Sequence, residues 1–197
     1  MVAGFTRVVA VVGTLIAGCS LQAIADDSDR GAQCEVAAAM PDHIRTSSCE
    51  MMRAIVTGMS DSPNFRHLVE RVAALHGIVY LTARQAVNPQ NRQTSDGSLQ
   101  HRVTIAGSHR VLYATVTPYS GLRPVPIIAH ELQHAVEVLE SNAMSEREID
   151  ELFDRIGMHT SASTVETAAA LAIEREVKKE LVSVSERERS GEARRRD

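Results

Sequence analysis

The chain has 197 residues, 44% of them hydrophobic, which is enough for one domain with a substantial core. Its formal net charge of −4 gives no electrostatic basis for binding nucleic acid. Aromatic residues make up only 3% and tryptophan is absent, which argues against surfaces that stack bases or sugars.

Residues 1–25 have the pattern of an export signal, in which the positive Arg7 precedes an apolar run too short to span a bilayer. Two cleavage sites stay open. The small residues that end at Ala25 favour an ordinary signal peptide. Ile16-Ala17-Gly18-Cys19 instead resembles a bacterial lipobox, in which Cys19 is lipidated and attaches the protein to a membrane. Both predict an exported protein: a cell-envelope lipoprotein, a periplasmic protein or a secreted one.

Residues 26–61 are expected to form a linker with short helices, one of them over Ser47–Met59 and ended by Gly58. Apart from Cys19, the cysteines are Cys34 and Cys49. In an oxidising compartment such an even pair predicts a disulfide, and two thiols are the alternative.

The main domain is expected over residues 62–184. Ser62 and Pro63 are typical of a helix start, and the apolar spacing that follows predicts a helix ended by Gly77. The β-branched and aromatic residues of Ile78–Leu81 then predict a strand.

Residues 88–98 are polar and are expected to form a loop. The runs His101–Ala106 and Arg110–Thr117 then predict a β-hairpin with a tight glycine turn. His101 and His109 flank this hairpin and are expected to be ordinary surface residues.

Two further helices are expected in the C-terminal part. Ser145 and Glu148 have the spacing of a capping box, and the apolar residues that follow are spaced for a helix. Ser163 and Glu166 have the same spacing before a longer apolar stripe. Residues 185–197 contain almost no apolar side chain and are expected to be a disordered polar tail.

Between the hairpin and these helices lies His130-Glu131-Leu132-Gln133-His134, an HExxH motif. Residues four apart on a helix lie about one turn apart on the same face, so both histidines can bind one metal ion. Glu131 projects to the side, where a metal-activated water could lose its proton. Zn²⁺ suits imidazole ligands and can leave one coordination position open.

The alternative is an ordinary amphipathic helix with two exposed histidines. The surroundings favour the metal site, because Pro126 suits a first helical turn and uncharged residues surround the motif. The apolar stripe has helical spacing and comprises Ile128, Leu132, Ala135, Val136 and Leu139.

The stretch AHELQHAVEVLE resembles the active-site helix of the zincin metallopeptidases, and also a group of uncharacterised bacterial proteins that share HELQHA. A weaker resemblance runs from about Ser62 to Leu181 and includes SPNFRHLVERV, IVYL and VETAAA. It implies a small zincin-like α+β domain: a short antiparallel sheet over the HExxH helix, followed by a helical part. The nearest candidate for the substrate-binding edge strand is Val111–Thr117.

The resemblance also implies a third metal ligand. Zincins with a third glutamate bring it from a downstream helix, and Glu166 fits this best, with Asp150 and Glu151 as rivals. Against the ligand role, Glu166 could serve only as a capping-box partner of Ser163. Glu137 lies on the face of the two histidines and is expected to orient one of them.

Two functions follow. In the first, the protein is a zinc metallopeptidase: Glu131 takes the proton from the attacking water, and zinc is held by His130, His134 and Glu166. An oxyanion stabiliser is open between Tyr119 and His159. In the second, the protein is a non-catalytic envelope protein that binds a partner and keeps the fold.

Overall fold

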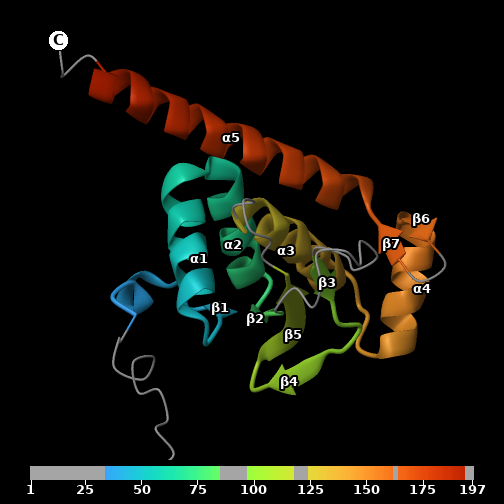
Figure 1. Cartoon of the computed structure of the whole chain (residues 1–197). Coiled ribbons are helices and arrows are strands. Elements are labelled where there is room, and N and C mark those ends of the chain that lie inside the picture. The colour runs from blue at the N-terminus through green and yellow to red at the C-terminus, as the bar shows by residue number, and fades with distance from the viewer. Residues whose placement is uncertain (1–33, 85–96, 118–123, 162–163, 194–197) are drawn as a thin grey trace, which may run out of the picture. The chain divides into compact units, whose positions relative to one another are not determined.

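The structure is a computed structural model that describes residues 34–84, 97–117, 124–161 and 164–193. Five α-helices, a five-stranded mixed sheet and a two-stranded sheet are found in these ranges (Figure 1), which confirms the mixed α+β class. The export signal with Cys19, residues 88–96 of the polar loop, and Tyr119 lie outside the described residues. None of the helices in these ranges has both the length and the apolar content needed to cross a bilayer.

The main sheet is built around strand β5 (His109–Val116), which pairs in parallel with β2 (Gly77–Ala83). Strand β1 (Ile44–Arg45) extends this parallel part, whereas β3 (Gly97–Leu99) and β4 (Thr104–Ala106) run antiparallel to β5. The expectation of an antiparallel sheet was therefore wrong. Parallel neighbours need a long crossover connection, and the two helices between β1 and β2 provide it.

The expected hairpin is confirmed, because β4 and β5 meet through a turn in which Gly107 has φ +61°. The expectation that Val111–Thr117 forms the edge was wrong. β5 is an interior strand with β2 on one side and both β3 and β4 on the other. The edge beside the HExxH helix is β3. Its first two residues, Gly97 and Ser98, were expected to end a polar loop.

The helix α3 (Val125–Glu140) lies between the sheet and helix α5 (Ala168–Ala193) (Figure 1). On one side α3 contacts β5 and β3, and on the other it contacts α5 and α2 (Pro63–Ala74). Because every face is covered, α3 is buried along nearly its whole length. The core around it includes Val79, Leu81, Leu112, Val116, Ile128, Leu132 and Val136.

The expected start of α2 is confirmed: the Ser62 hydroxyl accepts a hydrogen bond from the Phe65 amide at 3.0 Å. Gly58, however, does not end the preceding helix α1 (Cys49–Asp61). It lies inside α1, where the Phe65 ring packs against it. A Cβ atom at Gly58 would lie 2.7 Å from that ring.

Gly77 does not end α2 either. The helix stops at Ala74, and His76 takes the left-handed turn with φ 53°. Gly77 begins β2, where a Cβ atom would lie 2.3 Å from Leu139 of α3. Its small size therefore lets the strand approach α3 closely.

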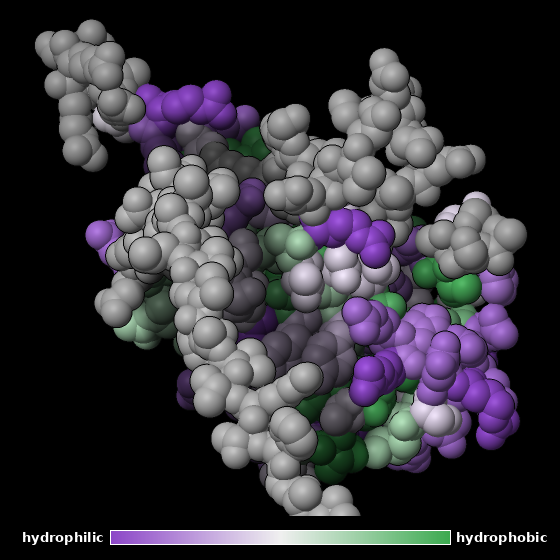
Figure 2. Space-filling model, turned by 60° about the horizontal axis from the view of Figure 1, so that its bottom comes forward, coloured by the Kyte–Doolittle hydropathy of each residue, from purple (hydrophilic) through white to green (hydrophobic). Residues whose placement is uncertain are grey.

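The capping box of Ser145 and Glu148 at the start of α4 (Glu146–Ile156) is confirmed. The apolar residues Ile149, Leu152 and Phe153 are buried, as expected for the inner face of α4. Ile156, the last residue of the helix, was also expected inside but is 43% exposed. The polar side chains of α4 gather on the right of Figure 2.

The expected helix start at Ser163 and Glu166 was wrong. Residues Met158–Ser161 and Thr164–Glu166 form strands β6 and β7, and α5 begins only at Ala168. Thr167 caps α5 instead, since its hydroxyl accepts a hydrogen bond from the Ala170 amide at 3.1 Å.

Helix α5 extends to Ala193, so residues 185–193 of the polar tail are helical, and residues 185–191 are largely solvent-exposed. Glu180 docks α5 onto the start of α2 by accepting hydrogen bonds from the side chains of Ser62 and Asn64, the latter at 2.7 Å.

No disulfide joins Cys34 and Cys49. The Cys34 thiol instead donates a hydrogen bond to the backbone carbonyl of Cys49, with 3.8 Å between Sγ and the oxygen.

Candidate metal centre

The HExxH motif occupies the buried middle of α3. His130, Glu131 and His134 are only 8%, 2% and 6% exposed. Pro126 lies in the first turn, as expected, and the apolar stripe from Ile128 to Leu139 is entirely buried. Three polar residues so close together are expensive to bury unless they have partners or a ligand.

The far end of α3 is fixed to the sheet by Arg110 of β5. Its guanidinium donates hydrogen bonds to the backbone carbonyls of Ser141, at 2.9 Å, and Leu139. Carbonyls at a helix C-terminus lack helical partners, and a cation also suits the negative end of the helix dipole. Arg110 therefore locks the position of α3 against β5.

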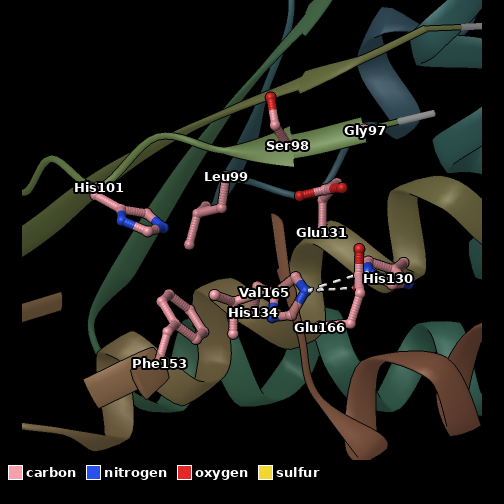
Figure 3. Close-up of a pocket in the computed structure, with 10 residues that line it drawn as sticks. All are labelled: Gly97, Ser98, Leu99, His101, His130, Glu131, His134, Phe153, Val165 and Glu166. Atoms are coloured by element: carbon pink, nitrogen blue, oxygen red, sulfur yellow. Dashed lines mark hydrogen bonds and ion pairs between the residues drawn. The ribbon is translucent and has the colours of Figure 1, made fainter. Parts of the chain in front are cut away.

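Three potential ligand atoms meet at one point above α3. Nε2 of His130 and Nε2 of His134 lie 3.1 Å apart. Oε2 of Glu166, from β7, lies 2.7 Å from Nε2 of His130 and 3.6 Å from Nε2 of His134 (Figure 3). Among the described residues, these three side chains form the group whose donor atoms all lie close enough together to hold one metal ion.

Each histidine is oriented by a further carboxylate. Nδ1 of His130 lies 2.9 Å from Oε2 of Glu174, on α5. Nδ1 of His134 lies 3.0 Å from Oε2 of Glu137, whose other oxygen accepts a hydrogen bond from Thr167 at 2.7 Å. A carboxylate on Nδ1 fixes the ring and directs the lone pair of Nε2 toward a metal, which is how ligating histidines are supported.

When both rings are neutral and Nδ1 of each donates to its carboxylate, the two Nε2 lone pairs face each other and the Glu166 carboxylate. This arrangement favours a positive charge at the point where they meet. Burial alone would lower the pKa of His130, but contacts with Glu166 and Glu174 outweigh burial and raise the pKa to about 10. Contact with His130 and then His134 lowers the pKa of Glu166 to about 2. A bound cation would satisfy all three groups at once.

The three atoms are separated by 3.1, 2.7 and 3.6 Å. They lie close enough together to hold one metal ion.

Glu131 lies beside this cluster under strand β3 (Figure 3). Burial raises the pKa of its carboxyl to about 7, although the nearby His134 and His130 oppose the shift. Its Oε2 atom has no hydrogen-bond partner among the described residues. A carboxyl that is buried, has an unpartnered oxygen and titrates near neutrality has the properties of a general base.

A pocket of about 150 Å³ opens beside these residues. Its polar side includes His130, Glu131, His134 and Glu166, and its apolar side is formed by Leu99, Phe153 and Val165. His101 also lines the pocket, where its ring stacks on Phe153 with centroids 5.2 Å apart. Nδ1 of His101 lies 2.5 Å from Asp150, so Nε2 is the ring nitrogen left for the pocket.

The other candidate residues are not part of the cluster of ligand atoms. Asp150 contacts His101, and Glu151 pairs with Arg147 at 2.6 Å on the surface of α4. His159 is exposed and lies 3.4 Å from Asp154.

Two titratable residues at the site, Glu174 and His101, were missed from the sequence. Glu174 occupies a core-facing position in the stripe Ala170, Val177 and Leu181, and a carboxylate at such a position was a detectable signal. His101 was expected to be an ordinary surface residue. The sequence around His101 gives no signal of this role, because the role depends on the packing of α4 against the residues that precede β4.

Comparisons with models of known families, with curated proteins and with solved structures found no match for this chain.

Proposed function

We propose that this protein is a zinc-dependent metallopeptidase with a zincin-like domain. The observation that carries the proposal is the convergence of His130, His134 and Glu166 beside the buried Glu131, in a pocket bordered by an edge strand. The likeness to zincins rests on the HExxH helix beneath the edge strand and on the downstream glutamate. The location of Glu166 on a strand rather than a helix departs from the expected pattern.

The donor set of two neutral imidazoles and one carboxylate fits zinc better than it fits magnesium or calcium, which prefer oxygen ligands. When bound, zinc would polarise the substrate carbonyl and lower the pKa of a nearby water toward neutrality. Glu137 and Glu174 hold the two imidazoles in the orientation and tautomer that binding requires.

Glu131 acts as the general base in this proposal. Its carboxylate accepts the proton of the attacking water and afterwards passes it to the amine that leaves when the peptide bond breaks. In the metal-free protein, burial raises the pKa of this carboxyl to about 7, which favours a group that both accepts and releases a proton. A purely structural zinc site has no use for a carboxylate at this position.

A peptide is the substrate that suits the pocket. Among the described residues β3 pairs with β5 alone, and we propose that its other edge pairs with the backbone of an extended peptide. Leu99, Phe153 and Val165 offer apolar contacts to a substrate side chain. The proposal is tested by assaying hydrolysis of an unfolded protein before and after removal of metal.

Zinc-loaded protein should hydrolyse the substrate, a strong chelator should abolish this, and added Zn²⁺ should restore it. The chelated protein should remain folded by circular dichroism, because its hydrophobic core does not depend on the metal. Hydrolysis that persists in chelator would contradict the proposal. Zinc binding without hydrolysis of any peptide substrate would instead favour the non-catalytic alternative.

Among the described residues, His101 is a better candidate for the oxyanion stabiliser than the exposed His159. In the doubly protonated ring, Nδ1–H donates to Asp150 and Nε2–H can donate to the carbonyl oxygen of a substrate in the pocket. His101→Ala should lower kcat by roughly 10²- to 10³-fold, as loss of one such donor does, and leave zinc affinity unchanged. Steady-state kinetics beside a zinc titration test this, and an unchanged kcat would remove His101 from the mechanism.

A further inference from the structure

Strand β3 passes directly over Glu131, and the residue at the crossing is Gly97 (Figure 3). A Cβ atom built on Gly97 would lie 2.2 Å from Oε1 of Glu131, 2.8 Å from its Cδ and 2.9 Å from its Cγ. Contacts this short do not occur between real atoms. The Glu131 carboxylate therefore occupies the space in which any other residue at position 97 would place its side chain.

The backbone conformation does not explain this glycine. Among the described glycines only Gly107 has a positive φ, so Gly97 has a conformation that other residues adopt freely. Alternation along the strand explains it instead, because residues 97 and 99 face the pocket side while Ser98 points away (Figure 3). Space for Glu131 is the remaining reason for a glycine.

We propose that Gly97 is a positioning residue for the general base, and that its missing side chain forms the seat of the Glu131 carboxylate. This inference rests on the proposed role of Glu131. The seat is rigid on both sides: β3 is fixed by the pairing of Gly97 with the fully buried Val116, and Glu131 projects from the buried helix α3. Separating the two backbones would disturb the pairing of β3 with β5 or the packing of α3 in the core.

The group that can yield is the end of the Glu131 side chain. With an alanine at position 97, the carboxylate must rotate away from β3 while the fold around it stays in place. A displacement of about 1 Å at a catalytic group can cost about a hundredfold in rate. The histidines and Glu166 are not in the short contacts of Gly97, so the zinc affinity should not change.

The test compares Gly97→Ala with Gly191→Ala, the same substitution at a site on α5 with open space around it. Gly97→Ala should lower kcat about a hundredfold with zinc affinity unchanged, and Gly191→Ala should change neither. In a Glu131→Asp background the shorter side chain leaves room for the new methyl group. There the loss from Gly97→Ala should be much smaller, which a general weakening of the fold would not produce.

A crystal structure of Gly97→Ala provides a readout that does not depend on activity. It should show the Glu131 carboxylate displaced and β3 in its original register. A carboxylate in its original place, or an equal loss of kcat in both backgrounds, would overturn the inference. If the wild-type protein hydrolyses no peptide, the proposed function fails, and the crystal structure still decides whether Gly97 forms the seat.

Discussion

Glu131→Gln should abolish most of the hydrolytic activity and leave the zinc content near that of the wild type. The amide has the size of the carboxylate and fits the same space beneath Gly97, but it cannot accept the proton of the attacking water. Loss of a general base of this kind costs roughly 10²- to 10⁴-fold in kcat. Hydrolysis of an unfolded protein and metal analysis of the same sample measure both quantities.

The stability of this variant provides a control for misfolding. The wild-type carboxyl is buried with an unpartnered oxygen, and its folded pKa of about 7 lies above the unfolded value of 4.5. The folded state therefore loses stability as the pH rises through this window, and the neutral glutamine avoids the loss. Without bound zinc, the variant should be at least as stable as the wild type at pH 8. Retained hydrolysis would remove Glu131 as the base, and loss of zinc would show that it supports the metal instead.

The features that could be predicted from the sequence depend on residues close together in the chain. The HExxH helix, the capping box of α4 and the β4–β5 hairpin all follow from local spacing and turn chemistry. The contact between Glu137 and His134 could also be predicted, because a spacing of three residues on a helix places the two side chains on one face.

The features that could not be predicted depend on how distant segments pack. β3 has only three residues, with a glycine first and no alternating pattern, so pairing with β5 alone makes it a strand. Glu174 reaches His130 only because α5 packs along α3. The position of Glu166 beside the histidines was expected through the family resemblance, whereas its location on β7 follows from pairing with β6.

The central claim is that His130, His134 and Glu166 form one zinc site, and Glu166 is the residue on which it depends most. Removing Glu166 would leave two imidazoles and a pair of supporting carboxylates, with no third protein ligand among the described residues. A lost ligand should weaken zinc binding by orders of magnitude. The effect should exceed the roughly 10- to 100-fold expected for loss of a supporting carboxylate such as Glu137.

Titration of zinc against a chelating dye measures this directly for the wild type, Glu166→Ala and His134→Ala. Glu151→Ala is the matched control, because it removes an exposed glutamate whose ion-pair partner in the described part of the chain is Arg147. The wild type and Glu151→Ala should each bind one zinc ion with the same affinity, and the other two variants should bind it orders of magnitude more weakly. A wild type that binds no zinc, or a Glu166→Ala variant with wild-type affinity, would contradict the proposed site.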